Sequence, residues 1–238
     1  MHKRPTPTCS QCRLREQCLP VDLSCAQLER VDGLVSQRIR VRRGQTLIHP
    51  GSTFRSLFAI RSGFFKSVHG MANGREQVVG FQMAGDTLGL DGMGSGQHSS
   101  SVVALEDAEV CAMSFAQMEG LAREIGPMQK HIHQLLGREM AHERNVMLLL
   151  GSMSAEERVA AFLLDLLQRL HQRGLSASEL VLRMSRADIG SYLGLKLETV
   201  SRTFSKLAAD GLLEVDKRHV RVVNAEALQR TGRGLAAA

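Results

Sequence analysis

Four of the five cysteines lie near the start of the chain, and their spacing suits metal or redox chemistry. Cys9 and Cys12 form a Cys-x-x-Cys pair, and Cys18 follows shortly after. Both zinc and iron–sulfur clusters favour such thiolates, and both need four ligands. The fourth ligand stays open between Cys25, which is close in sequence, and Cys111, which is remote. Spacing alone does not separate zinc from iron, and unligated surface cysteines are a third interpretation.

The segment that carries these thiols is basic and has little hydrophobic periodicity. Arg4, Arg13 and Arg15 flank the cysteines, and their charges favour thiolates and would partly offset those of a tetrathiolate cluster. We therefore expect residues 1–30 to form a flexible, cysteine-bearing arm.

A second pattern with functional meaning covers residues 185–211, which predict a helix-turn-helix. Ser185, with Asp188 three residues later, resembles a capping box that starts the first helix. Gly194 permits the tight turn between the helices, and Gly211 suits the end of the second. The apolar positions of the second helix form its buried face: Val200, Phe204 and Leu207.

The remaining positions of the second helix face outward, where they can read DNA. The residues are Glu198, Ser201, Arg202 and Lys206. Arginine bonds a guanine edge with two hydrogen bonds, and glutamate accepts from a cytosine amino group. Lys196 stands where a Ser or Thr cap is preferred, so we assign it to a phosphate contact. Residues 213–223 alternate around a polar turn and predict a wing that carries cations toward phosphates; a plain three-helix subdomain with a charged surface is the alternative.

The elements that must position these residues begin with a glycine-punctuated segment, residues 33–113. Short β-prone runs lie between the glycines, and Asn73-Gly74 is a strong hairpin turn. Such spacing predicts an antiparallel barrel, sandwich or roll. Ser114 can cap a short helix after it.

A long amphipathic helix follows from about Gly126-Pro127. Its apolar stripe either packs on the β domain or pairs with a second copy of the chain. The stripe and its edge supply the candidate dimer interface: Ile132, Leu136, Met140, Glu143, Met147 and Leu150. Two copies of Glu143 near a two-fold axis would repel each other, whereas at the edge of the stripe this residue would stay solvated. Residues 155–173 predict a further helix.

The composition and the motifs limit the kinds of protein that this chain can be. The net charge is +6, and the two ends of the chain are basic, which suits a polyanionic partner such as nucleic acid. No run of residues is long and apolar enough for a membrane span or a secretory signal, so we expect a cytoplasmic protein. No nucleophile elbow, phosphate-binding loop or His-Glu-x-x-His motif is present, so we do not expect an enzyme.

The order of these parts resembles the CRP/FNR superfamily over nearly the whole chain. The match to the FNR branch is carried by short segments: Cys9-Ser-Gln-Cys12-Arg-Leu-Arg-Glu-Gln-Cys18-Leu-Pro, Met83-Ala-Gly85-Asp86, Glu109-Val-Cys111, Ala155-Glu156-Glu157-Arg158-Val-Ala-Ala-Phe162 and Glu198-Thr-Val-Ser201-Arg202. These segments are specific when they occur together in one chain.

The resemblance implies one 4Fe–4S cluster per subunit, bound by Cys9, Cys12, Cys18 and Cys111. The intact cluster would favour a homodimer, and oxygen would convert the cluster and release monomers. The acidic position on the dimer helix matches Glu143. The implied target is an inverted repeat resembling TTGAT and ATCAA, and loops near residues 71–77 and 101–110 would contact RNA polymerase.

The cyclic-AMP branch of the superfamily is the rival. Its phosphate site uses a Gly-Glu-Leu step and an Arg-Ser pair, whereas this chain has Leu88-Gly89-Leu90-Asp91 and His98-Ser99-Ser100-Ser101. The arginine is missing and Asp91 would repel phosphate, so we expect no cyclic-nucleotide control.

The sequence thus predicts an α+β protein. It would have a cysteine-bearing arm (1–30), a jelly-roll-like antiparallel β-roll (31–125), a dimerisation helix (126–151) and a winged helix-turn-helix (152–238). The predicted function is an oxygen-sensing transcription regulator. The alternative is a DNA-binding regulator of the same fold controlled by zinc or thiol redox.

Overall fold

The computed structural model describes residues 9–232 of the chain. The chain divides into two units, Met1–Glu139 and Met140–Ala238, and helix α5 (Gly126–Ser152) contains the boundary. Arg4 lies outside the described residues.

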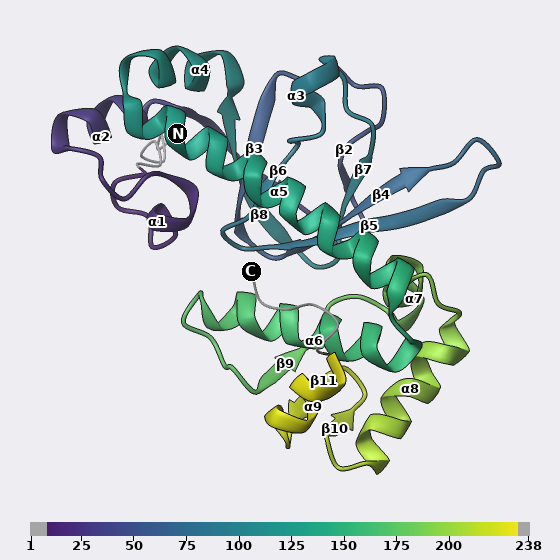
Figure 1. Ribbon diagram of the computed structural model, residues 1–238. Helices are drawn as coiled ribbons and strands as arrows, with labels where there is room; N and C mark the ends of the chain where they lie inside the picture. Colours follow the sequence, from purple (N-terminus) through teal and green to yellow (C-terminus); the bar gives the residue numbers. More distant parts are fainter. Residues whose placement is uncertain (1–8, 233–238) are drawn as a thin grey trace. The chain divides into compact units, whose positions relative to one another are not determined.

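The first unit is built on two four-stranded sheets, which stack as a jelly-roll-like β domain (Figure 1). One sheet has the order β1-β8-β3-β6, and the other has the order β2-β7-β4-β5. The strands are β1 (Val35–Val41), β2 (Thr46–Ile48), β3 (Ser56–Ser62), β4 (Phe64–Gly70), β5 (Glu76–Met83), β6 (Thr87–Leu88), β7 (Ser101–Ala104) and β8 (Ala108–Ser114). The antiparallel roll predicted from the glycine spacing is confirmed, and Asn73-Gly74 forms the β4–β5 turn with Gly74 at φ +77°.

The buried faces of the two sheets enclose the first core. Its residues include Ile60, Phe65 and Val110, which are completely buried. Because side chains alternate across a strand, Cys111 points to the opposite face of its sheet from Val110. That face carries a second core together with Met113, Met118 and other apolar side chains.

Helices cover this second face. They are α1 (Arg15–Cys18), α2 (Cys25–Asp32), α4 (Phe115–Glu124) and the start of α5, and α3 (Gly92–Ser95) lies in the β6–β7 loop. Ser24 caps α2 in a capping box, and Ser114 caps α4 as predicted. Arg30 of α2 pairs with Glu124 of α4, and Figure 1 shows these two helices beside each other.

The expectation of a flexible arm is wrong for the described residues. Leu19 is 3% exposed and belongs to the second core, and Cys9 and Cys18 pack against the same core. The periodicity is hard to read from sequence because α1 has only four residues and α2 only eight. Helix α2 also extends to Asp32, past the predicted arm boundary at residue 30.

The second unit is a winged helix-turn-helix. Its elements are α6 (Ala155–His171), β9 (Glu179–Val181), α7 (Arg186–Leu193), α8 (Leu197–Ala209), β10 (Leu213–Asp216), β11 (His219–Val222) and α9 (Ala225–Gly232). The strands form one sheet of order β10-β11-β9. Strand β9 and helix α9 have no counterpart in the sequence prediction, because a strand of three residues and a helix of eight give too weak a pattern.

Helix α6 is the apolar centre of this unit. Its stripe buries Val159, Phe162, Leu163 and neighbouring residues. Ser154 and Glu157 form a capping box at its start, which fixes where the helix begins. A Cβ on Gly232 would lie 2.9 Å from Leu164 Cδ1 and 3.1 Å from the Ala161 backbone nitrogen, so α9 lies close against α6 at this position.

Candidate metal centre and nucleic-acid interface

The N-terminal arm is anchored to the β domain by polar contacts. Ser10 donates twice to Asp32 at the end of α2, from its backbone N–H to Oδ1 (2.8 Å) and from its hydroxyl to Oδ2 (2.7 Å). Gln17 packs onto Gly85, where a Cβ would lie only 1.9 Å from Gln17 Oε1. Gly85 also has φ +93°, so glycine at this turn serves both the backbone and the approach of the arm.

This anchoring brings the arm cysteines to the face of the sheet that carries Cys111. Cys9, Cys18 and Cys111 are half-buried and pack against the same core. Cys12 lies one turn from Cys9, and its N–H donates to the Cys9 carbonyl (3.0 Å). Cys25 is exposed at the first position of α2.

The four thiols influence one another electrostatically. Burial is the main cause that raises the pKa of Cys18 to about 12, and the charges of Cys12, Cys111 and Cys9 add to it. The pKa of Cys9 also rises to about 12, chiefly through burial and then through Asp32 and Cys111. Nearby thiolates thus destabilise one another unless a cation is bound among them.

Arg38 is a functional candidate that was not predicted from the sequence. It lies on β1 directly opposite Cys111 of β8. Burial raises the pKa of Cys111, whereas the charge of Arg38 and a hydrogen bond from it act in the opposite direction. A period-two strand pattern says nothing about the partner strand, so this pairing is visible only in the fold.

Within residues 9–232, no three His, Cys, Asp or Glu side chains are grouped closely enough to hold one metal ion.

The same part of the chain contains no helix long and apolar enough to cross a membrane.

The helix-turn-helix follows the predicted pattern closely. Ser185 and Asp188 form the capping box, and Gly194 ends α7 in the left-handed conformation with φ +64°. Gly211 follows the C-cap of α8 with φ +72°. The predicted apolar face of α8 is buried: Val200, Phe204 and Leu207.

The predicted reading side chains all face solvent. Glu198, Ser201 and Arg202 are exposed on the N-terminal part of α8. Lys196 is exposed at the N-cap and makes no side-chain cap bond. Lys206 is exposed, but its ammonium lies 2.5 Å from Glu156 Oε1 of α6, and this contact raises its pKa.

Arg186 supports α8 from beneath. Its guanidinium lies 3.3 Å from the centre of the Phe204 ring, and burial lowers its pKa to about 10. A cation over an aromatic face is stabilised by the ring quadrupole. The aromatic ring and the arginine therefore fix the orientation of α8 relative to α7.

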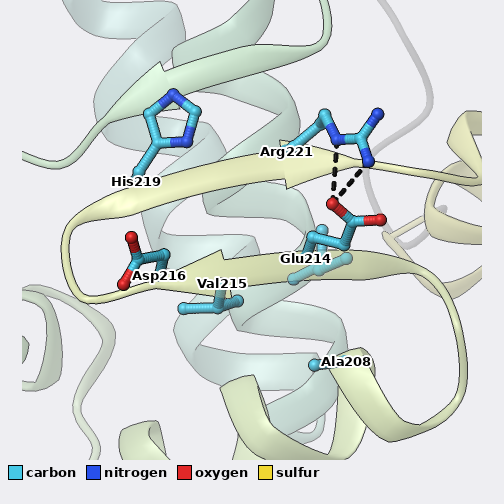
Figure 2. A pocket seen from close by; sticks show the side chains of 7 residues that line it. Ala208, Glu214, Val215, Asp216, His219 and Arg221 are labelled. Atoms are coloured by element: carbon cyan, nitrogen blue, oxygen red, sulfur yellow. Dashed lines mark hydrogen bonds and ion pairs between the residues drawn. The ribbon is translucent and has the colours of Figure 1, made fainter.

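The wing presents fewer free cations than the sequence suggested. Figure 2 shows Arg221 of β11 pointing at Glu214 of β10, with the guanidinium Nε 3.0 Å from Glu214 Oε2. The shallow pocket beside this pair is lined by both wing strands and by Ala208 of α8. Lys217 and Arg218 are exposed in the hairpin turn, where Lys217 adopts φ +52°.

The candidate dimer residues on α5 differ in their exposure to solvent. Ile132, Leu136 and Leu150 are half-buried within the chain, and Ile132 packs on the second core. Met140 and Met147 are 65% and 66% exposed. Glu143, midway between these two methionines, is also exposed.

Each of the two units matches a known protein family. Residues 38–124 match the cyclic nucleotide-binding domain family, and residues 157–231 match the Crp-like helix-turn-helix domain. The transcriptional regulatory protein Btr of Bordetella pertussis is 39% identical over 222 residues, which are 93% of this chain and 92% of Btr. The chain belongs to the CRP/FNR family.

Other CRP/FNR members extend the comparison. The fumarate and nitrate reduction regulatory protein of Escherichia coli K12 is 37% identical over 220 residues, covering 92% of this chain and 88% of that protein. The structure of FixK2 from Bradyrhizobium japonicum has a TM-score of 0.77 and 31% identity, and covers 86% of this chain and 100% of that one. This CRP/FNR protein is thus a DNA-binding transcription regulator and not an enzyme.

Proposed function

We propose that this regulator senses oxygen through one 4Fe–4S cluster per subunit, bound by Cys9, Cys12, Cys18 and Cys111. The observation that supports the proposal is the anchored arm. Ser10 and Gln17 hold three arm cysteines at the face of the sheet that carries Cys111. The similarity to the fumarate and nitrate reduction regulator is a second support.

The chemistry of the donor set fits such a cluster. All four candidate ligands are sulfur, which iron–sulfur clusters favour. The charges of Cys9, Cys12 and Cys111 influence the pKa of Cys18, which supports a site that these four thiols share.

When bound, the cluster supplies the sensitivity to oxygen. The protein's part is to hold the thiols: the Ser10–Asp32 contact fixes the start of the arm, and strand β8 fixes Cys111. Arg38 places a positive charge beside Cys111, which offsets part of the charge of four thiolates.

We further propose that α5 pairs with its copy in a homodimer. The exposed Met140 and Met147 stand two helical turns apart, at the spacing of a coiled-coil seam. Two Glu143 side chains near the axis would weaken the pair, so that a change in the sensor can shift it. A two-fold dimer then presents two copies of α8 to an inverted repeat resembling TTGAT and ATCAA.

In this proposal Glu198, Ser201 and Arg202 read bases, and Lys196 and Lys206 contact phosphates. Residues 71–77, at the β4–β5 hairpin, and 101–110 contact RNA polymerase. We assign the arm, β-roll, dimer helix and DNA-binding domain to residues 1–30, 31–125, 126–151 and 152–238. The regulator would act in the cytoplasm without cyclic-nucleotide control.

Anaerobic purification tests the cluster. We expect a straw-brown protein with iron and sulfide in equal amounts, and visible absorption that changes on exposure to air. Cys111→Ser should lose the colour and the iron, whereas Cys25→Ser should keep both, because Cys25 is exposed outside the proposed ligand set. A colourless protein with one zinc per chain would support the zinc alternative and reject oxygen sensing by a cluster.

A further inference from the structure

The β6–β7 loop surrounds one carboxylate with hydrogen-bond donors. Asp91 Oδ2 accepts from the Ser99 N–H (2.8 Å), the Ser99 hydroxyl (3.1 Å) and the Ser100 N–H (3.1 Å). Asp91 Oδ1 lies 3.0 Å from His98 Nδ1. Two successive backbone N–H groups, a hydroxyl and an imidazole thus converge on one anion.

The donors are held in place by contacts that do not involve Asp91. The His98 N–H donates to the Ser52 carbonyl (3.0 Å), and the His98 carbonyl accepts from the Gly51 N–H (2.7 Å). Strand β7 begins at Ser101, directly after the two donating residues. The donor segment is therefore anchored on one side by the His98 backbone and on the other by strand β7.

The imidazole is fixed equally firmly. His98 is 5% exposed, and its ring packs edge-on against Phe54 with the ring centres 5.6 Å apart. Gly89 lies against the other side, where a Cβ would stand 3.2 Å from His98 Cε1. A buried imidazole with one nitrogen aimed at Asp91 is a donor built into the loop rather than a chance surface contact.

Consecutive backbone N–H groups that point into one concavity form a general site for anions such as phosphate. The loop lies within residues 38–124, which match a domain family named for ligands that carry a phosphodiester anion. Here the chain supplies its own anion. Burial raises the pKa of Asp91, but the hydrogen bonds from His98, Ser99 and Ser100 outweigh burial and lower that pKa below its usual value.

We propose that Asp91 is an intramolecular ligand that occupies a preformed phosphate-type anion site built by His98, Ser99 and Ser100. The Asp91 carboxylate holds the β6–β7 loop in the way that a bound phosphate would, so no external ligand is needed. Asp91 thereby does more than repel phosphate: it takes the place of phosphate. This proposal is independent of the cluster, since it concerns the β6–β7 loop alone.

The test uses the full-length protein and inorganic phosphate as the probe. In Asp91→Ala, the thermal midpoint should fall by roughly 5 °C, and phosphate should raise it again in a saturable way at constant ionic strength. The wild type should show no such response to phosphate or to cyclic AMP. Asp107→Ala is the matched control, because the Asp107 carboxylate accepts a backbone N–H from Arg43 (2.9 Å) in the same unit. That variant should gain no stability from phosphate.

A second measurement uses the wild-type protein, so that the proposal can be tested even if Asp91→Ala does not fold. The Ser99 and Ser100 amide resonances should not move when phosphate is added, because Asp91 already fills the site. In Asp91→Asn they should shift from their wild-type positions, because a neutral amide replaces the carboxylate. The proposal is overturned if phosphate or cyclic AMP moves these amides in the wild type, or if phosphate stabilises Asp91→Ala no more than Asp107→Ala.

Discussion

The ammonium of Lys206 lies 2.5 Å from the Glu156 carboxylate, so the cation near the end of α8 forms an ion pair with α6. Both side chains are exposed, and the pair is one that DNA phosphates can compete for. Glu156→Gln should release Lys206 and remove a negative charge from the DNA-facing surface. We expect tighter binding to random DNA and a salt slope that is steeper by about 0.9. Fluorescence anisotropy over a salt series measures both.

The same pair provides a control through a double-mutant cycle. Lys206→Ala should weaken binding to all sequences alike and lower the salt dependence. That loss should be larger in the Glu156→Gln background, where Lys206 is no longer shared. Equal losses in the two backgrounds would show that the ion pair has no influence on DNA binding.

Arg202→Ala should act on specificity. Arg202 is exposed on the N-terminal half of α8, where a guanidinium can reach a guanine edge. We expect a loss of about 1–3 kcal/mol, concentrated at one base pair of each half-site. Ser205→Ala, also at an exposed position of α8, should change binding little. Competition between operator variants that differ at single positions measures the effect, and a uniform loss across sequences would contradict the assigned role.

The Asp91 network should make part of the stability depend on pH. The folded pKa of Asp91 lies below its usual value of about 3.9. Its stabilising contribution is therefore complete above the unfolded pKa and is lost as the pH falls through the folded pKa. Urea unfolding from pH 7 to pH 3 should show wild type and Asp91→Ala converging at the acid end. A difference that stays constant down to pH 3 would argue against an ionised Asp91.

The dimer helix should respond in opposite directions to two changes. Met147→Glu places a charge on a residue that is 66% exposed in the chain and that we assign to the dimer seam. Burial of unpaired charges is costly, so the variant should stay monomeric. Glu143→Ala removes the repulsion between two carboxylates and should strengthen the dimer. Sedimentation velocity over a concentration series measures both, and a Met147→Glu dimer as tight as wild type would place the seam elsewhere.

Arg158 should be irreplaceable by lysine. Its guanidinium donates to three backbone carbonyls, those of Leu150 (2.8 Å), Met153 (2.9 Å) and Leu193 (2.9 Å). It thus links the ends of α5 and α7, whose last carbonyls lack partners within their helices. Lysine cannot span three acceptors, so Arg158→Lys should destabilise the second unit by about 2–4 kcal/mol. Urea unfolding measures the loss, with the exposed Arg144 replaced by lysine as the control.

Much of the second unit was predictable because its signals are local. The Ser185–Asp188 cap, the left-handed Gly194 and the apolar face of α8 each act within a few residues. The glycine-separated strands and the long helix were also predicted from short-range patterns. These signals depend on backbone conformation and side-chain period, which neighbouring residues determine.

Other features depend on contacts between distant segments. The docking of Gln17 on Gly85, the Arg38–Cys111 pairing and the Lys206–Glu156 ion pair join residues far apart in sequence. Gly85 and Glu156 stand in segments shared with the family, but their physical roles could not be predicted without their partners.

The surroundings of Asp91 are a further example. From the sequence, the negative charge of Asp91 predicts only that phosphate binding beside it is unfavourable. Its enclosure by His98, Ser99 and Ser100 is visible only in the fold, because the turn of the β6–β7 loop brings these donors back to it.

Strand β8 is hydrogen-bonded to β1 on one side and to β3 on the other, with Cys111 in the middle of both ladders. Shifting Cys111 would break two ladders at once, whereas residues 9–18 belong to no sheet. If the proposed cluster is gained or lost at these thiols, we therefore expect the accompanying movement in residues 9–18 rather than in strand β8. In that proposal Cys9, Cys12 and Cys18 would move, and Cys111 would be the fixed point against which they move.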